Sequence, residues 1–292
     1  MGWFLFVPHR GARRGVRQGK IATPRRARVG RQGRVWDRTD AMLTLLVVIW
    51  GTAFPGVKAL LQVLDPYQLT WYRYAPFPLL YGAFLLARRS AVFRQVAGRD
   101  WALMAVLGTV GVIGYHFPLN WGLHDGADGI QVTAATGAIL VATTPLWTLI
   151  ISVLTGRERW HGATAAGSLV AFLGVAVVVF LGKGHVEFTA AGKTLVILLA
   201  PLSWAVYSIY TKPLIQRYGG LFVTGVTLSL GTFTLLPLAF QYGAAPLRAL
   251  GPVDWAWLAF LAILSTVLGY AMWNQALKVR SASAVSAYVY FN

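Results

Sequence analysis

Three basic side chains lie well inside long apolar runs of this sequence, namely Lys58, Arg73 and His116. An ionisable residue at the depth of a membrane is costly, and it commonly marks a substrate path or a proton relay. Each of the three lies six or seven residues from the end of its run, which in a helix corresponds to roughly 10 Å below the surface. Together they could form a cationic vestibule near the outer surface that attracts a carboxylate or a phosphate.

Each of these residues also has a structural interpretation. Long basic side chains can extend along apolar surface and place their charge among the headgroups. We favour this for Lys58, because its counterpart in the internal repeat described below, Lys212, also marks the end of an apolar run. Arg73 could equally pair with Asp65, and His116 fits a hydrogen-bonded packing residue better than a proton carrier. No Asp or Glu falls inside the apolar runs, which favours uniport or exchange over a carboxylate proton relay.

Aromatic side chains deep in the runs are candidates for a cavity wall, whereas aromatics at run ends usually form interfacial belts. The predicted substrate-binding set therefore consists of Trp50, Lys58, Arg73, His116, Trp147, Trp204 and Tyr207. The glycines Gly108, Gly111 and Gly114 have a three-residue spacing that predicts a smooth face for close helix packing. Glu158, between Arg157 and Arg159, is expected to form a solvated cytoplasmic ion pair.

Membrane-spanning helices are the elements that must position these residues. Of the 292 residues 57% are hydrophobic and only 12% charged, about half the charged fraction of a soluble domain. Crossing the hydrocarbon core takes about 20 residues of helix. Eight apolar runs suit this, at residues 41–64, 67–87, 101–123, 129–154, 162–181, 190–211, 221–242 and 255–277, and a ninth begins at Ser281. The sequence thus predicts an all-α integral membrane protein.

The positive charge follows the topology of these runs. With a cytoplasmic N-terminus, 21 of the 26 Lys and Arg residues lie in inside segments and three in outside segments, as the positive-inside rule requires. Residues 1–40 hold eleven of them and are predicted to form a disordered basic arm that faces anionic headgroups. The arm lacks interleaved aromatics, so we predict no nucleic-acid partner. We expect a multi-pass protein of the inner membrane.

The sequence also repeats itself at an offset of 154 residues. This register pairs Trp50 with Trp204, Lys58 with Lys212, Thr70 with Thr224, Asp100-Trp101-Ala102 with Asp254-Trp255-Ala256, and Asn120 with Asn274. Each unit, residues 41–181 and 190–292, would contain an odd number of spans, five, and so enter the membrane from opposite sides. Inverted repeats are typical of secondary transporters, whose substrate site lies near the midplane between the halves.

The motifs resemble those of EamA-type proteins in the drug/metabolite transporter superfamily. The resemblance rests on Ile49-Trp50-Gly51-Thr52-Ala53-Phe54, Arg73, Thr144-Pro145-Leu146, Gly156-Arg157-Glu158-Arg159, Ser203-Trp204-Ala205 and Asn274-Gln275-Ala276-Leu277. It covers residues 41–292 and implies ten helices in two inverted five-helix repeats, with both termini cytoplasmic. It also implies carriage of small metabolites, often amino acids or related compounds and frequently outward. This chain departs from the pattern by an insert at residues 125–129.

The ninth run ends with the chain. As a helix, residues 281–292 would span about 18 Å of a core that is roughly 30 Å thick. We therefore expect an incomplete transporter without a tenth helix. The alternative is a short variant whose ninth segment lies at the interface or docks with another subunit, and a homodimer is possible.

The sequence predicts a secondary transporter that moves a small polar or anionic metabolite, such as an amino acid, by alternating access, with export as the direction. Two alternatives stay open: an intramembrane enzyme acting on a lipid or isoprenoid, and a scaffold subunit that transports nothing. The chain has no Cys, and its five His residues are scattered. We therefore predict no catalytic residue, no metal and no cofactor.

Overall fold

The computed structural model describes residues 36–88, 91–125, 132–181 and 191–291, and every regular element in these ranges is helical. From residue 37 onward the chain forms one compact unit. Residues 1–35 of the predicted basic arm lie outside the described residues.

Within the described ranges, helices occupy all eight predicted apolar runs. They are α1 (Arg38–Leu60), α2 (Pro66–Tyr74), α3 (Pro76–Arg88), α4 (Gly98–Thr109), α5 (Tyr115–Leu123), α6 (Ala134–Val141), α7 (Thr144–Leu154), α8 (Gly162–Leu181), α9 (Ala191–Ile197), α10 (Leu199–Tyr218), α11 (Gly220–Phe233), α12 (Leu236–Tyr242), α13 (Pro252–Ala259), α14 (Gly269–Val279) and α15 (Ala282–Ser286). Two π-helical segments, Val110–Gly114 and Phe260–Leu268, join α4 to α5 and α13 to α14. Short 3-10 turns cover Ala91–Gln95, Ala245–Ala249 and Ala287–Phe291.

The first helix begins at a capping box. The Asp37 carboxylate accepts hydrogen bonds from the backbone N–H groups of Thr39 (2.7 Å) and Asp40 (3.0 Å), and the Asp40 carboxylate accepts one from the Asp37 N–H. Such a box satisfies N–H groups that have no partner within the helix. Because of it, α1 starts three residues before the predicted position 41, and residues 38–40 belong to the helix instead of the arm.

Several predicted spans are interrupted, and two of the interruptions lie beside residues that line the cavity described below. The second run breaks at Ala75, where Pro76 starts α3, and the fourth breaks at Ala142 and Thr143, just before Pro145. Proline removes a backbone donor and clashes with the preceding turn, so it favours a new helix start. Broken helices are tolerated at membrane depth only where protein or a cavity surrounds them.

The sixth span is longer than predicted. It was expected to end at residue 211, but α10 continues to Tyr218, where Gly219 with φ +89° ends it. Pro213 lies inside this helix without stopping it. Lys212 is therefore a helical residue with a full turn of helix beyond it.

Five helical stretches of the described ranges are long and apolar enough to cross a membrane, namely Arg38–Leu60, Gly98–Leu123, Ala134–Leu154, Gly192–Tyr218 and Pro252–Val279. On α8 the side chains of Leu169, Val170 and Leu173 are exposed. An apolar outer surface of this kind suits contact with lipid. The described chain is thus a helical membrane protein, as the composition predicts.

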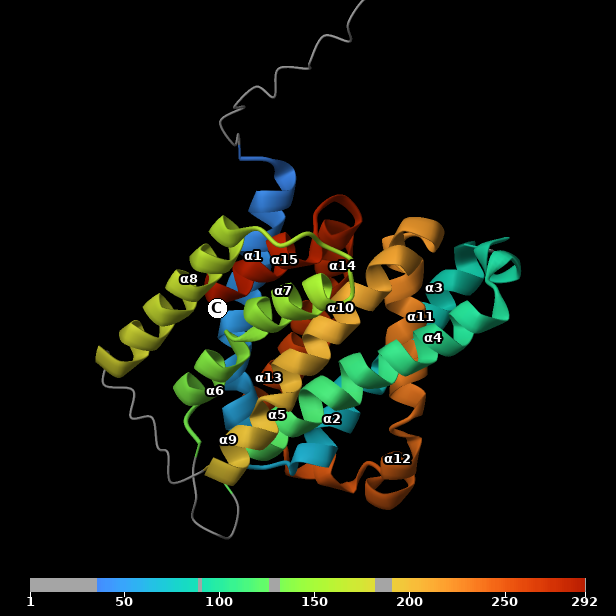
Figure 1. The fold of residues 1–292 in the computed structure, drawn as a ribbon. Helices are drawn as coiled ribbons and strands as arrows, with labels where there is room; N and C mark the ends of the chain where they lie inside the picture. Colours follow the sequence, from blue (N-terminus) through green and yellow to red (C-terminus); the bar gives the residue numbers. More distant parts are fainter. Residues whose placement is uncertain (1–35, 89–90, 126–131, 182–190, 292) are drawn as a thin grey trace, which may run out of the picture. The chain divides into compact units, whose positions relative to one another are not determined.

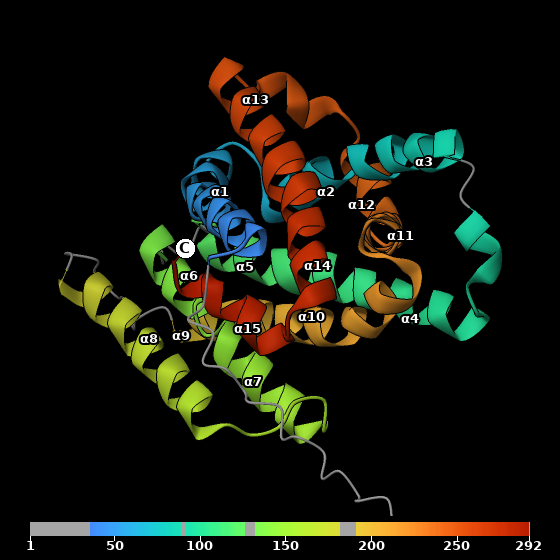
Figure 2. The same cartoon turned by 90° about the horizontal axis from the view of Figure 1, so that it is seen from above.

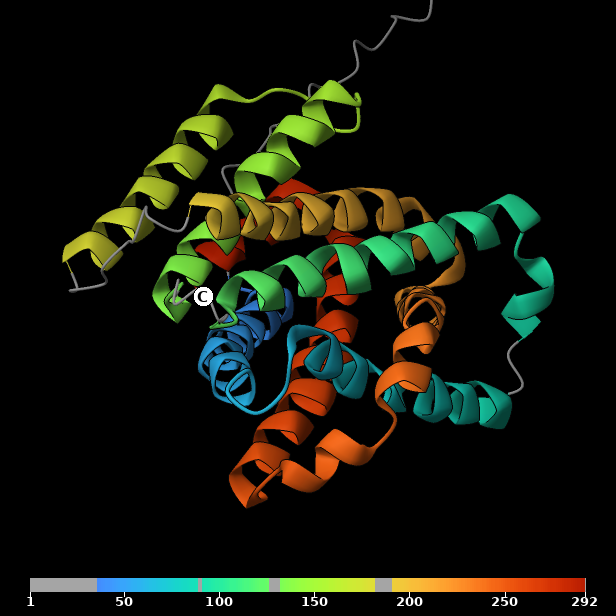
Figure 3. The same cartoon turned by 90° about the horizontal axis from the view of Figure 1, so that it is seen from below.

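The helices enclose a central group. Figure 3 shows α10 running beside α4 and α5, and Figure 2 shows α11 end-on between α3 and α4. The continuous rod of α13 and α14 passes between α1 and α11, while α8 lies at the edge against α6 and α7 (Figures 1 and 2). The elements that carry the predicted site residues therefore surround one central region.

Small residues allow the closest of these crossings. A Cβ on Gly108 would lie 2.0 Å from the Thr227 carbonyl oxygen, and one on Gly231 would lie 2.3 Å from the Gly108 oxygen. Cβ atoms on Gly111 and Gly114 would likewise come within 2.9 Å of Tyr207 and 2.8 Å of Ser203. The prediction that this glycine stripe serves close helix packing is confirmed.

Candidate functional site

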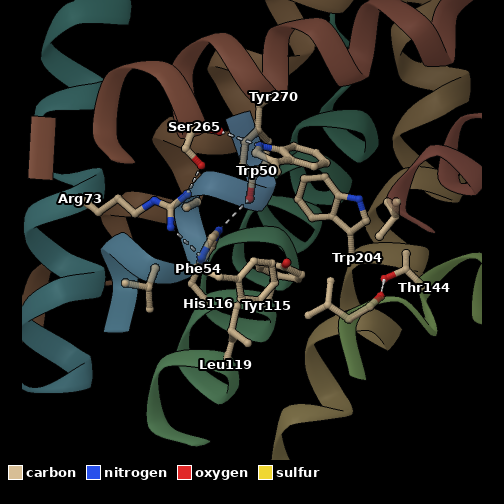
Figure 4. Close-up of a pocket in the computed structure, with 14 residues that line it drawn as sticks. Trp50, Phe54, Arg73, Tyr115, His116, Leu119, Thr144, Trp204, Ser265 and Tyr270 are labelled. Carbon is tan, nitrogen blue, oxygen red and sulfur yellow. Dashed lines mark hydrogen bonds between the residues drawn. The ribbon is translucent and has the colours of Figure 1, made fainter. Parts of the chain in front are cut away.

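A cavity lies where the interrupted helices meet, and its volume is about 560 Å³ when its open mouth is counted. α1, α2, α5, α7, α10, α14 and the π segment before α14 all contribute to its wall. Figure 4 shows Arg73 on one side, Thr144 on the other, and the rings of Trp50, Tyr115 and Trp204 between them. Among the described residues, the wall is thus mostly apolar, with several aromatic rings and one permanent cation.

Arg73 is held by hydroxyl groups of a distant segment. Its Nε donates to the Thr266 hydroxyl (2.7 Å) and its Nη2 to the Ser265 hydroxyl (3.0 Å). Its Nη1 lies 3.4 Å from Nδ1 of His116. The side chain is only 5% exposed, so it does not reach a headgroup region.

The predicted alternative of an Arg73–Asp65 pair is wrong. The Asp65 carboxylate instead caps α2, accepting from the N–H groups of Tyr67 (2.8 Å) and Gln68 (2.9 Å). Among the described residues, no acidic side chain pairs with Arg73. A guanidinium carries five N–H donors, and three are engaged here, so two remain for a ligand.

His116 is a neutral link in a hydrogen-bond chain. Arginine cannot accept a hydrogen bond, so Nδ1 of His116 must be the acceptor and its proton must be on Nε2. Nε2 lies 3.5 Å from the Tyr270 hydroxyl, which donates to the Gly111 carbonyl (2.9 Å). The Tyr74 hydroxyl, 3.1 Å from that of Tyr270, then acts as a donor. This series of hydrogen bonds fixes the ring of His116 next to the guanidinium of Arg73.

The aromatic wall centres on Trp204. Its ring lies 5.3 Å from that of Trp50 in an edge-to-face arrangement, 5.2 Å from Tyr115 and 4.9 Å from Tyr270. Edge-to-face packing is the geometry that aromatic quadrupoles favour. The Trp50 Nε1 donates to the Ser265 carbonyl (3.0 Å). The Trp204 Nε1 is buried and has no partner in the part of the chain that the structure describes.

Residues separated by the repeat offset of 154 meet each other at the cavity wall. Trp50 and Trp204 are 154 residues apart, and so are His116 and Tyr270; both pairs are in contact. Arg73, by contrast, has a threonine, Thr227, at the matching position. The cavity therefore receives matched aromatic partners from the two halves but a cation from only one.

An asparagine–threonine hydrogen bond occurs at equivalent positions of the two repeat units. Asn120 donates to the Thr70 hydroxyl (3.0 Å), and Asn274 donates to the Thr224 hydroxyl (2.7 Å). In each case the asparagine lies on the helix after the π segment. These contacts hold equivalent helices at equivalent positions in the two halves.

Three predicted site residues do not line the cavity. Lys58 forms an ion pair with Asp125 (2.5 Å) and donates to the Leu123 carbonyl (2.9 Å), so it ties the end of α1 to the segment after α5. This contact matches neither of the predictions for Lys58, which were a place in a cationic vestibule and a charge that reaches the lipid headgroups. Trp147 is half-buried on α7, and Tyr207 is fully buried behind Trp204, where its hydroxyl accepts from Asn274 (2.9 Å).

Phe54 and Thr144 belong to the family motifs but were not predicted as site residues, and Tyr115 and Ser265 were not singled out at all. Hydroxyls and phenyl rings are common in membrane helices, so nothing in their type points to a site. Tyr270 was one of many aromatics in the runs, although its 154-residue distance from His116 could have identified it.

A second cluster of polar contacts lies among the ends of α1, α7 and α14. Arg280 pairs with Asp37 (3.0 Å) and Asp40 (2.6 Å). The Asp40 N–H and Arg280 together lower the pKa of the Asp37 carboxyl. Glu158 does not pair with Arg157 or Arg159 as predicted, because its carboxylate accepts from the N–H (3.2 Å) and the hydroxyl of Ser283 at the start of α15.

The cavity can therefore bind an anion and stack an apolar group, since Arg73 and Trp204 keep free N–H donors on a largely apolar wall that includes several aromatic rings. Residues 38–180 and 193–292 match the EamA-like transporter family. The chain belongs to this family. It is an EamA-like multi-pass membrane protein, in agreement with the resemblance of its motifs.

The relatives of this EamA-like chain are named as exporters or transporters. A probable terminal-alkyne amino-acid exporter of Streptantibioticus cattleyicolor is 31% identical, with 85% of this chain and 79% of the relative covered. An uncharacterized transporter of Archaeoglobus fulgidus is 30% identical (87% and 85% covered). A probable amino-acid metabolite efflux pump of Escherichia coli is 25% identical (82% and 78% covered).

The fold is also found in a solved crystal structure. The two chains superpose with a TM-score of 0.65 at 19% identity, and the match covers 86% of this chain and 83% of the other. At this identity the likeness concerns the fold alone.

Proposed function

We propose that this EamA-like protein is a secondary transporter that exports a small carboxylate-bearing metabolite, an amino acid or a related compound, across the cytoplasmic membrane. One observation carries the proposal: Arg73 is buried in the cavity wall and has no acidic partner among the described residues. The names of two relatives, an amino-acid exporter and an amino-acid metabolite efflux pump, support the substrate class and the direction.

The energetics of a buried cation favour an anionic ligand. An ionised group removed from water needs hydrogen bonds and a counter-charge to offset its lost hydration. The hydroxyl groups of Ser265 and Thr266 supply hydrogen bonds to Arg73, but they carry no charge. A carboxylate supplies the counter-charge, and it can accept two parallel N–H bonds from the guanidinium, which also fixes its orientation. Arg73 is thus a binding residue in this account.

Two sets of contacts close the bundle on either side of the cavity. At one end Lys58 and Asp125 join α1 to the segment after α5. At the other end Arg280 joins α14 to the start of α1, and Glu158 joins the segment after α7 to α15. In the proposed cycle, each set opens in turn while the other stays closed, so that Arg73 faces alternate sides. In this proposal the Arg280 end is the cytoplasmic one.

Counterflow tests the proposal. Proteoliposomes are loaded with an unlabelled amino acid or carboxylate in excess and diluted into a trace of the labelled compound. A carrier accumulates label transiently against its gradient, whereas a channel only equilibrates it. Accumulation by the wild type and its loss in Arg73→Ala are expected, with Trp147→Phe as a control that leaves the cavity wall unchanged. Chemical conversion of the compound would instead indicate an enzyme, and no flux with any carboxylate would contradict the proposal.

A further inference from the structure

Two residues of the cavity wall keep N–H donors that have no partner among the described residues. Arg73 keeps two N–H groups after its contacts with His116, Ser265 and Thr266. The Trp204 Nε1–H has no partner, and its side chain is only 4% exposed. A buried donor without an acceptor is costly, so a ligand that fits this wall presents acceptor atoms to both residues.

Several acceptors at or near the wall are, by contrast, already engaged. The Ser265 hydroxyl oxygen and Nδ1 of His116 accept from Arg73. The Ser265 carbonyl accepts from Trp50, and the Gly111 carbonyl accepts from Tyr270. An ammonium group has three donors and no acceptor, so it would have to share these atoms or use the hydroxyl oxygens of Tyr115 and Thr144, none of which carries a negative charge.

The charges of the wall point the same way. Arg73 is the one permanently charged residue among the described residues that line the cavity, and no Asp or Glu is among them. In an α-amino acid the ammonium group is bonded to the carbon that carries the carboxylate. A carboxylate seated on Arg73 would therefore bring its own ammonium close to the guanidinium, where like charges repel strongly because the site is poorly hydrated.

We infer that the preferred substrate is a carboxylate without an ammonium group, such as a 2-oxo acid, a 2-hydroxy acid or an N-acylated amino acid, with a flat apolar body. The inference rests on the proposed function and narrows its substrate class. The carboxylate binds Arg73 and the body lies among the rings of Trp50, Tyr115 and Trp204. The indole nitrogen of Trp204 lies on the side of its ring away from Arg73 (Figure 4), so it takes an acceptor at the far end of the body.

Matched pairs of compounds test the inference. Counterflow by the intact protein is measured with phenylpyruvate, phenyllactate and N-acetylphenylalanine as competitors, each beside phenylalanine, and with phenylethylamine as a cationic control. These compounds share the ring and differ at the amino position. We expect at least one of the three ammonium-free acids to half-saturate at a concentration tenfold or more below that of phenylalanine, and the amine not to compete. Equal or tighter binding of phenylalanine overturns the inference while leaving the proposed transporter intact.

A second measurement isolates the Trp204 donor. Trp204→Phe keeps an aromatic ring but removes the N–H. It should raise the half-saturating concentration of 4-hydroxyphenylpyruvate by a severalfold larger factor than that of phenylpyruvate, while Trp147→Phe changes neither. An equal effect on both acids would show that Trp204 contributes only its ring. Lack of counterflow with every carboxylate, in protein that stays monodisperse, would reject both this inference and the proposed function.

Discussion

Replacing Gly108 by alanine tests whether α4 and α11 meet with their backbones in contact. The added Cβ would lie 2.0 Å from the Thr227 carbonyl oxygen, about 1.4 Å short of the 3.4 Å at which ordinary contact begins. Its second neighbour, the Gly231 nitrogen at 2.9 Å, is also backbone. No side chain can rotate away, so the two helices must separate.

The expected cost follows from this geometry. Overpacking a well-packed core costs about 1–3 kcal/mol, and the upper end applies because backbone atoms cause the clash. For a domain of this order of size, each kcal/mol lowers the Tm by roughly 2–4 °C. We therefore expect Gly108→Ala to lower the Tm by roughly 6–12 °C.

The assay is thermal unfolding of the purified protein in detergent, read from the fraction that elutes as a monodisperse peak after heating. Gly167→Ala is the matched control, because Gly167 lies on α8 and its Cβ would meet nothing within 4 Å. If the Tm of Gly108→Ala equals that of Gly167→Ala and of the wild type, the close crossing of α4 and α11 is wrong.

Three further predictions concern topology, an ion pair and the binding residue. A reporter fused after Arg99 should report the cytoplasm and one after Asp125 the exterior; reversed signals would reject the orientation. Burial by itself raises the pKa of the Asp125 carboxyl, but hydrogen bonds from Lys58 and Gln62 lower it by more. The net pKa is therefore below the usual 3.8. The pair therefore stabilises the fold above about pH 4 and fades as the pH falls through the lowered pKa. Lys58→Gln should cost about 0.5–1 kcal/mol at pH 7, with its melting curve converging on that of the wild type in acid; a pH-independent difference would contradict the pairing. Arg73→Ala should raise the half-saturating substrate concentration about 10–100-fold, as expected for a charged hydrogen bond, at a normal protein level in the membrane; unchanged transport would make Arg73 structural.

Composition and charge placement were enough to predict the helical membrane class, whereas helix breaks depended on tertiary packing. Pro118 and Pro213 lie inside α5 and α10, but Pro76 and Pro145 coincide with new helix starts. The residue type is the same in all four cases. Neighbouring helices decide whether the freed carbonyl is satisfied in place or the helix restarts, and a single sequence does not show those neighbours.

The candidate site was only partly predictable for a similar reason. Arg73, His116, Trp50 and Trp204 stood out as ionisable or large aromatic residues at membrane depth, and all four line the cavity. Lys58 stood out equally, yet its partner Asp125 lies in the insert that interrupts the family pattern, 67 residues away. Local sequence shows a charge, but its partner is known only from the fold.

The lack of cysteine in the chain permits the most direct test of the central claim that the substrate occupies the Arg73 cavity. A single cysteine is introduced as Thr144→Cys, a position that is buried and lines the cavity, and its rate of alkylation by a small maleimide is measured in proteoliposomes. Thr155→Cys, at the exposed end of the same helix, is the control. The account predicts that a compound shown to drive counterflow slows alkylation at position 144, with half-protection near its half-saturating concentration, and leaves position 155 unaffected. Transport of that compound with an unchanged alkylation rate at position 144 would contradict the account.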